Sequence, residues 1–254
     1  MKIALIGTRG IPAAYSGFET AVEHLARAFT ARGHEVTVYC RPHVTERRDE
    51  HAGARLVHLP TIRNKYLDTL AHTTLSTGHM VTTERPDVAI YFIAGNAPVV
   101  PIARLAGVPS VLQIDGMDSQ RAKWPRAARA IIRQFEHMSA AAATLAVTDS
   151  ESVADLYEQR FGRRLLAIPY GADLPDPGTT EMLDELRLTA GEYILFVGRL
   201  VPENNAHLLI DAHAGIDTEW PLVIVGDAPY ADQYIADLRA CAGDDVLFPG
   251  YVFG

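Results

Sequence analysis

The chain has 254 residues, 48% hydrophobic and 21% charged, which is ordinary for a globular protein of one large or two smaller domains. The net charge of −8 argues against a general nucleic-acid binder, and no apolar run is long enough to cross a bilayer. We see no secretory signal, and Cys40 and Cys241 lack the spacing of metal ligands. We therefore expect two buried thiols in a cytoplasmic protein.

Strand and helix patterns alternate along the first two thirds of the chain. A short buried strand at 3–7 precedes an amphipathic helix at 17–32, which Gly33 ends before the strand EVTVYC. The alternation continues through the strands ARLVHLP, DVAIYFI, SVLQID, TLAVT and LLAIPYG, with helices at 66–83, 98–107, 126–143 and 150–161. This order predicts an α/β domain with a doubly wound parallel sheet over residues 1–170.

A second, smaller α/β segment follows a region rich in Gly, Pro and Asp. We assign 171–191 to a linker and connecting helix, and 192–254 to the first half of a second Rossmann-like domain. Strands EYILFVGRL, PLVIVGD and DVLFPGYV alternate there with helices at 203–214 and 229–241, and we expect the remainder of that domain to be missing. Up to Tyr170 there are 20 Lys and Arg against 16 Asp and Glu; from Gly171 there are 3 against 15. This asymmetry predicts two parts with different tasks.

The loop GTRGIPAAYSGFET, which follows the first strand, is longer than a simple turn requires. A Gly-rich loop between a first strand and a first helix brings backbone N–H groups to an anionic ligand. Arg9 adds a positive charge, and Gly17 allows a ligand to approach the backbone closely. Ser16 and Glu19 have the spacing of a capping box and mark the start of the helix; the alternative is that they only cap this helix and take no part in binding. The loop lacks the G-x-G-x-x-G spacing, which disfavours a nicotinamide dehydrogenase.

Several segments together resemble one family. The opening loop resembles the N-terminal signature of the rhamnosyltransferase-like branch of the retaining glycosyltransferases of family 4, which have the GT-B fold; Ser16 stands where that signature has Gly. IDGMDSQRAKW, IPYGAD, FVGRLVPENN, LVIVGDAP and LFPGYV resemble later segments of that family in order and spacing. The resemblance covers nearly the whole chain, and we expect this chain to lack the C-terminal part of the family.

The resemblance implies two Rossmann-like domains, with a nucleoside-diphosphate sugar held mainly by the second. Arg199 is then the best candidate for the donor phosphate and for catalysis, although a surface salt bridge is the alternative. Relatives carry a Lys nearby, where this chain has Asn204 and Asn205, so Arg9 is a candidate for the additional cation. The remaining donor-side candidates are Gly17, Gly226, Asp227, Pro249 and Gly250. No metal is expected, because cationic side chains and helix N-termini stabilise the leaving diphosphate.

On the acceptor side, the candidates in the first domain are Phe18, Glu19, Asp115, Gly116, Arg121 and Trp124. Asp115 follows the strand SVLQI, at the edge where such sheets bind ligands. Many relatives have a His at or beside this point, whereas here Ile114 precedes Asp115, so a catalytic His is in doubt. Asp115 either orients or deprotonates an acceptor hydroxyl or is a structural turn residue.

The segment RAKWPRAARAIIRQF at 121–135 has five cations and no acid: Arg121, Lys123, Arg126, Arg129 and Arg133. Interleaved apolar side chains would suit contact with the inner leaflet of an anionic membrane. Alternatively it is a domain helix that packs Ile131, Ile132 and Phe135 inward and leaves a solvated basic face.

We therefore expect a glycosyltransferase that moves rhamnose or another hexose from a nucleoside-diphosphate sugar to a glycan or lipid-linked acceptor with retention, in the synthesis of a surface polysaccharide. The alternatives are a truncated, inactive binding fragment of such an enzyme and a GT-B-fold nucleotide-sugar epimerase or phosphorylase. An epimerase would require more carboxylates and a His facing the cleft than the Asp115 region offers.

Overall fold

The computed structural model describes residues 1–13, 17–64, 67–120, 124–172, 178, 180–228 and 231–252. The chain divides into two compact units, Met1–Gly171 (unit 1) and Ala172–Gly254 (unit 2). Within the described part of the chain, no helix has the length and apolar character needed to span a membrane.

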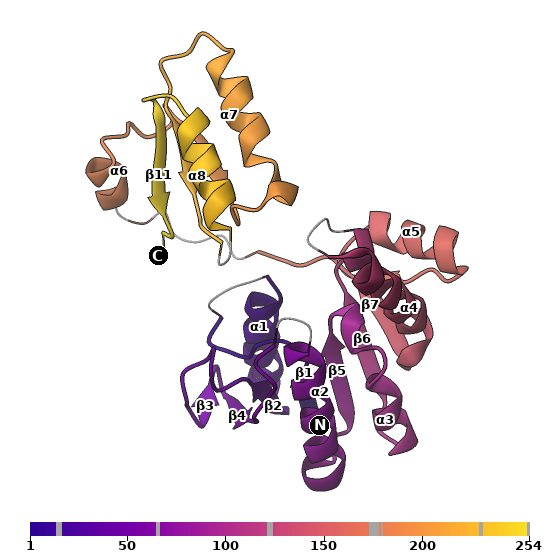
Figure 1. The fold of residues 1–254 in the computed structure, drawn as a ribbon. Coiled ribbons are helices and arrows are strands. Elements are labelled where there is room, and N and C mark those ends of the chain that lie inside the picture. Colours follow the sequence, from indigo (N-terminus) through magenta and orange to yellow (C-terminus); the bar gives the residue numbers. More distant parts are fainter. Residues whose placement is uncertain are drawn as a thin grey trace. The chain divides into compact units, whose positions relative to one another are not determined.

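Unit 1 is built on one eight-stranded sheet with the order β3-β4-β2-β1-β5-β6-β7-β8 (Figure 1). The strands are β1 Lys2–Ile6, β2 Glu35–Cys40, β3 Glu50–His51, β4 Ala54–His58, β5 Val88–Phe92, β6 Ser110–Ile114, β7 Leu145–Thr148 and β8 Leu166–Ala167. All neighbours are parallel except the β3–β4 hairpin, which the sequence patterns did not predict. The order reverses between β1 and β5, and this switch point is where doubly wound sheets bind ligands.

The helices of unit 1 connect these parallel strands. They are α1 Gly17–Ala31, α2 Asp68–His79, α3 Val100–Leu105, α4 Arg126–Ala142 and α5 Glu151–Phe161. A π-helical turn at Met80–Glu84 extends α2, and 3-10 turns lie at Ala94–Asn96 and Asp118–Gln120. Gly162, with φ 67°, ends α5 in the left-handed conformation, and its N–H donates to the carbonyl of Glu158.

Both faces of the sheet are covered, as expected for parallel strands. Successive side chains of a strand point to opposite faces, so β1 contributes to two cores. Ile3 and Leu5 pack in a cluster with Val22 and Ala26 of α1, whereas Ala4 and Ile6 belong to the cluster that contains Met80 of the π-helical turn and residues of α3, α4 and α5. The continuous apolar run of β1 follows from this burial on both faces.

Unit 2 has a three-stranded parallel sheet with the order β11-β10-β9. Its strands are β9 Ile194–Val197, β10 Leu222–Val225 and β11 Val246–Gly250, and its helices are α6 Glu181–Glu185, α7 Ala206–Ala214 and α8 Asp232–Cys241. The core contains Leu200, Ala206, Ile210, Leu222, Ile224 and Leu238. The predicted α/β class is confirmed: a Rossmann-like first unit is followed by a partial second one.

Some local predictions were wrong. Cys40 is buried, but Cys241 is exposed because it is the last residue of α8. The helix predicted at 203–214 is interrupted: a 3-10 turn at Pro202–Asn204 is followed by Asn205 in the left-handed conformation, and α7 begins only at Ala206. The strand predicted over LLAIPYG is reduced to Leu166–Ala167.

The alternative in which α4 packs Ile131, Ile132 and Phe135 inward was wrong for Ile131, which is 57% exposed, whereas Ile132 and Phe135 are half-buried. The buried residues of this helix are Glu136, Ser139 and Ala142, which recur every three residues on one face. Two of these three residues, Glu136 and Ser139, are polar, and Glu136 is hydrogen-bonded to Ser119 of the loop after β6.

Candidate functional site

The loops that follow β1 and β5 meet closely at the switch point of unit 1. Gly7 has φ +108°, and a Cβ atom built on it would lie 2.7 Å from Asn96 Nδ2. Asn96 Nδ2 donates to the carbonyl of Phe92 at 2.7 Å, and Ile93 has a positive φ of 72°, which is strained for a β-branched residue. Such strain is stored where the surrounding structure fixes a particular backbone path.

Two carboxylates of α1 hold the described part of the opening loop. Glu19, which is 4% exposed, accepts a hydrogen bond from the N–H of Arg9 through Oε1 at 3.1 Å. One turn later, Glu23 Oε2 accepts from the N–H of Ala13 at 2.8 Å, and its Oε1 lies 3.0 Å from His51 Nε2. Partial burial opposes ionisation of Glu23, but the bonds from Ala13 and His51 prevail and lower its pKa. The helix thus shapes the loop that precedes it.

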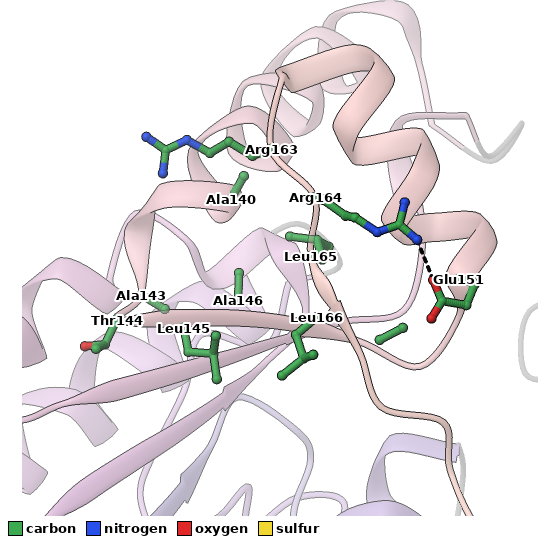
Figure 2. A pocket seen from close by; sticks show the side chains of 11 residues that line it. Ala140, Ala143, Thr144, Leu145, Ala146, Glu151, Arg163, Arg164, Leu165 and Leu166 are labelled. Carbon is green, nitrogen blue, oxygen red and sulfur yellow. Dashed lines mark hydrogen bonds and ion pairs between the residues drawn. The ribbon is translucent and has the colours of Figure 1, made fainter.

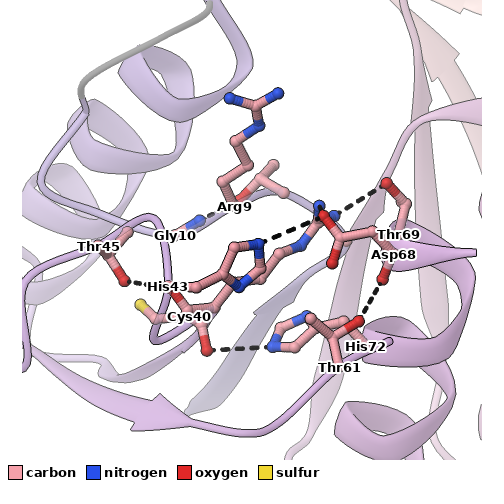
Figure 3. Close-up of polar contacts among 12 residues, drawn as sticks. Arg9, Gly10, Cys40, His43, Thr45, Thr61, Asp68, Thr69 and His72 are labelled. Carbon is pink, nitrogen blue, oxygen red and sulfur yellow. Dashed lines mark hydrogen bonds and ion pairs between the residues drawn. The ribbon is translucent and has the colours of Figure 1, made fainter. Parts of the chain in front are cut away.

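A pair formed by the buried Arg41 and the half-buried Asp68 lies beside this loop at the end of β2 (Figure 3). The Arg41 side chain is 4% exposed; its Nη1 donates to Asp68 Oδ2 at 2.8 Å and its Nη2 to Thr69 Oγ1 at 3.0 Å. Burial lowers the pKa of Arg41, an effect that Asp68 opposes and the charge of Arg9 reinforces. The N–H of Arg41 also donates to the carbonyl of Arg9 at 2.9 Å, whereas the Arg9 side chain extends away from this cluster (Figure 3).

His72 of α2 completes the same cluster from below. It is fully buried, and its Nε2 donates to the carbonyl of Cys40 at 3.1 Å, which keeps the end of β2 in place. Burial, reinforced by the charge of Arg41, lowers the pKa of His72 to about 4. His72 is therefore neutral at pH 7, and because a carbonyl can only accept, its proton lies on Nε2.

The loop after β6 carries Asp115 and Gly116, both half-buried. Ser119, four residues beyond Asp115, is 4% exposed and donates to the fully buried Glu136 of α4 twice, through N–H at 2.8 Å and through Oγ at 2.6 Å. Since β1 and β6 are parallel strands of one sheet, Arg9 and Asp115 lie at its same edge, separated by β5.

Other predicted residues of unit 1 have varied environments. Gly17 is the first residue of α1, is exposed, and has no atom within 4 Å of a built Cβ, so a ligand can approach its backbone. The Phe18 ring packs edge-to-face on Phe92 with centroids 5.8 Å apart, and the carbonyl of Trp124 accepts from Arg129 Nε at 2.7 Å. Ser16, Arg121 and Lys123 lie outside the described residues.

In unit 2, the predicted donor residues gather at the carboxyl ends of three parallel strands. Arg199 follows β9, Gly226 and Asp227 follow β10, and Gly250 ends β11. Asn204 Nδ2 donates to the carbonyl of Arg199 at 2.8 Å, so this side chain shapes the turn after β9. Asn205 is exposed and precedes the first residue of α7.

Backbone contacts hold these strand ends together. The N–H of Gly226 donates to the carbonyl of Gly250 at 2.8 Å, and the N–H of Gly198 donates to the carbonyl of Val225 at 3.0 Å. Gly226 has φ +133°, and a Cβ built on it would overlap the carbonyl oxygen of Gly198. A side chain is excluded there because the turns after β9 and β10 touch through their backbones.

The structure therefore places the predicted residues in two groups, each at the carboxyl edge of the sheet in its own unit. The sequence analysis missed Arg41, Asp68, His72 and Glu136. Arg41 directly follows the predicted strand EVTVYC, so the rule that ligands bind at strand ends could have identified it. Nothing in the sequence distinguishes Glu136 from a surface residue of a helix.

Two further observations concern the surroundings. A hollow of about 570 Å³ lies beside β7 and β8, lined by Ala140, Ala143, Thr144, Leu145, Ala146, Glu151, Arg163, Arg164, Leu165, Leu166 and Ala167 (Figure 2). It contains none of the predicted site residues, and Arg164 Nη2 donates to Glu151 there at 2.7 Å.

In the part of the chain that the structure describes, no three His, Cys, Asp or Glu residues are grouped as a metal site.

Solved structures share this fold across the whole chain. The HepE protein of Anabaena in complex with UDP-glucose is 18% identical, with a TM-score of 0.74 over 100% of this chain and 70% of that chain. Sucrose-phosphate synthase from Thermosynechococcus elongatus is 20% identical, with a TM-score of 0.73 over 99% and 70%. UDP-N-acetylglucosamine 2-epimerase from Rickettsia bellii is 14% identical, with a TM-score of 0.57 over 99% and 69%. At these identities the likeness shows the fold alone.

Family membership comes from the sequence itself. Among curated proteins, none matches the chain significantly. The sequence model of the glycosyl transferase 4-like domain matches residues 16–171, and that of the glycosyl transferases group 1 matches residues 180–253. Because the first match covers more than half of the 254 residues, this chain belongs to the glycosyl transferase 4-like family and is a glycosyltransferase of the GT-B fold.

Proposed function

We propose that the chain transfers a hexose, rhamnose or a related sugar, from a nucleoside-diphosphate sugar to a glycan or lipid-linked acceptor, with retention of configuration and without a metal ion. The observation that carries this proposal is the group of residues at the carboxyl edge of unit 2, where Arg199, Gly226, Asp227 and Gly250 end three parallel strands. The complex of HepE with UDP-glucose supports a nucleotide sugar as the donor.

The charge distribution of unit 2 makes Arg199 the main phosphate ligand. Unit 2 has 15 acidic residues and three cations, Arg187, Arg199 and Arg239. The structure describes all three. Arg187 precedes β9 and Arg239 lies in the last turn of α8, so of the three only Arg199 lies just beyond the end of a strand. A diphosphate at this edge would meet the Arg199 guanidinium and the N-terminus of α7, both of which favour the charge that develops on the leaving group.

On the acceptor side, we assign Asp115 to the acceptor hydroxyl, as the group that orients it or removes its proton. We assign Arg9 as a second cation for the leaving diphosphate, and Phe18, Glu19, Gly116, Arg121 and Trp124 as further acceptor-binding residues. Glu19 would act there through the backbone of Arg9, with which it is hydrogen-bonded. Gly17, with open space at its Cα, would allow a phosphate to approach the start of α1.

We further propose that the protein is cytoplasmic and contacts the inner membrane leaflet through α4. Arg126 and Arg133 of this helix are exposed and, being seven residues apart, lie on the same face, whereas the exposed Ile131 lies on another side of the helix. Cations gathered on one exposed face suit an anionic lipid surface, where lipid-linked acceptors would be met.

An epimerase is the second candidate, because the Rickettsia bellii epimerase shares the fold. A fragment that only binds its ligand is the third. Product analysis separates the three: a transferase joins sugar to acceptor, an epimerase changes the free nucleotide sugar, and a binding fragment does neither.

The first experiment is thermal unfolding of the chain with UDP, dTDP, GDP and their sugar conjugates at equal concentration. A ligand that binds only the native state raises the midpoint by mass action. We expect one nucleotide to raise it, and Arg199→Ala but not Arg187→Ala to abolish the rise. The nucleotide so identified then enters a transfer assay with and without EDTA, where retained activity supports a metal-independent reaction. If no nucleotide shifts the midpoint, or if both variants respond alike, the assignment of Arg199 is wrong.

A further inference from the structure

A carboxylate is fully buried behind the Asp115 loop. Glu136 of α4 is 0% exposed, and within the described residues no Lys, Arg or His forms an ion pair with it. Its two oxygens are used by one residue: Oε1 accepts from the N–H of Ser119 at 2.8 Å, and Oε2 accepts from Ser119 Oγ at 2.6 Å. The carboxylate therefore binds Ser119 with both oxygens.

Packing alone does not account for this choice of residue. A buried carboxylate is costly to desolvate, and apolar residues of similar volume often stabilise a protein core as well or better. The neighbouring inward positions of α4 are taken by the small residues Ser139 and Ala142. The distinguishing property of Glu136 is that it can hold a backbone N–H and a hydroxyl of another segment at once.

The segment it holds is the loop that carries the proposed acceptor group. Ser119 is the middle residue of the 3-10 turn Asp118–Gln120, which is closed by the bond from the N–H of Gln120 to the carbonyl of Met117 at 3.1 Å. Asp115 lies at the start of the same loop, directly after β6. Fixing Ser119 therefore fixes the far end of a short loop whose near end is the strand itself.

The surroundings of Tyr157 place these groups together. The Tyr157 hydroxyl lies 3.2 Å from Ser139 Oγ, and Ser139 Oγ donates to the carbonyl of Glu136 at 2.7 Å. Burial raises the pKa of Tyr157, and the charges of Glu136, Asp115 and Asp118 raise it further. The three carboxylates are therefore near enough to Tyr157 to act on it through their charge, and Glu136 is joined to the loop by its bonds to Ser119.

We propose that Glu136 is a positioning residue, which holds the Asp115 loop through Ser119 in the geometry needed to receive the acceptor. The bond joins the two residues that flank the basic segment in the sequence, because its five cations lie between Ser119 and Glu136. This inference rests on the proposed function of Asp115. It assigns no contact between Glu136 and the substrate.

The test compares the wild type with Ser119→Ala, Ser119→Thr, Glu136→Gln and Ser139→Ala in steady-state transfer. We expect Ser119→Ala and Glu136→Gln to lower kcat/KM for the acceptor about 10- to 100-fold, because displaced reacting groups lose rate steeply. The midpoint shift caused by the donor nucleotide should not change. Ser119→Thr keeps the hydroxyl and should restore most of the activity. Ser139→Ala removes a neighbouring buried hydroxyl without touching the loop, so it should retain wild-type kinetics.

Amide hydrogen exchange tests the same inference without activity. In Ser119→Ala and Glu136→Gln, residues 115–120 should exchange at least about tenfold faster than in the wild type, while in Ser139→Ala they should not. Unchanged exchange and kinetics in Ser119→Ala would overturn the positioning role, as would equal losses in Ser139→Ala. If exchange rises as expected but the wild type transfers no sugar, the proposed function fails while the anchoring of the loop stands.

Discussion

The two units hold their strand-end loops by different means. In unit 1 the loops are fixed by buried or half-buried ionisable side chains. Glu19 and Glu23 of α1 hold the opening loop, the Arg41–Asp68 pair holds the segment after β2, and Glu136 of α4 holds the Asp115 loop. In unit 2 they are fixed by backbone hydrogen bonds, by the uncharged side chain of Asn204 and by the close approach of Gly226 to Gly198.

This difference determines which substitutions each unit tolerates. Buried polar networks depend on charge and on the pairing of every member, so unit 1 should be sensitive to neutralisation of a carboxylate. Backbone-to-backbone packing depends on the absence of a side chain, so unit 2 should be sensitive to addition of a single methyl group. The chain has one tryptophan in each unit, Trp124 and Trp220, so fluorescence can follow the units separately.

The largest effect is expected from Gly226→Ala. The added Cβ would overlap the Gly198 carbonyl oxygen at a φ of +133°. Overpacking costs about 1–3 kcal/mol and strained backbone about the same, so we expect a loss of about 4 kcal/mol in the free energy of unfolding. Urea unfolding followed by Trp220 in a Trp124→Phe background measures it.

Gly250→Ala is the matched control for this substitution. Gly250 also has a positive φ, +81°, but no atom lies within 4 Å of its built Cβ. Only the backbone strain of about 1–2 kcal/mol should remain. If both variants lose the same free energy of unfolding, close packing of the turns after β9 and β10 is not what makes unit 2 sensitive to an added methyl group.

Asp68→Asn should have the next largest effect. It leaves the Arg41 guanidinium, 4% exposed, without its charged partner. Removing one member of a buried ion pair costs about 3 kcal/mol or more. We expect that loss in urea unfolding followed by Trp124 in a Trp220→Phe background.

The control for Asp68→Asn is Asp155→Asn. Asp155 pairs with Arg164 at the surface, where Arg164 is also bonded to Glu151 and Glu158. Because water screens exposed pairs, the unfolding midpoint should hardly change. A midpoint that falls as far in Asp155→Asn as in Asp68→Asn would contradict the importance that we give to burial.

The smallest effect is expected from Glu23→Gln, and it should depend on pH. Glu23 bonds the N–H of Ala13 and lies 3.0 Å from His51 Nε2, and its pKa is lowered from 4.5. A carboxylate whose pKa is lowered by folding stabilises the native state above its unfolded pKa, and this stabilisation is lost as pH falls through the folded pKa. We expect Glu23→Gln to lose about 1 kcal/mol at pH 6, and the difference from wild type to vanish as pH falls well below 4.5.

The exposed Glu46, which pairs with Arg48, provides the comparison. Glu46→Gln should leave the unfolding midpoint unchanged at pH 6 and at low pH, because an exposed pair contributes little. A pH-independent loss in Glu23→Gln would mean that the size and shape of Glu23, rather than its charge, hold the loop.

The alternation of strands and helices determined the α/β class from the sequence. The continuous apolar run of β1 and the helical spacing of Val22 and Ala26 depend only on neighbouring residues, so β1, α1 and β2 could be predicted closely. The strand-end rule supported Asp115, and the Gly-rich loop after the first strand indicated Arg9, whereas Arg199 and Gly226 came from the family resemblance.

Tertiary structure alone decided how those strand ends are held. Ser119 and Glu136 are 17 residues apart, and Arg41 and Asp68 are 27 apart. Such pairs form only when packing removes both partners from water, and residue type and periodicity do not record which partners meet. A Glu on a helix therefore looks like a solvated side chain in the sequence, and only the fold shows that Glu136 is buried against the loop that it holds.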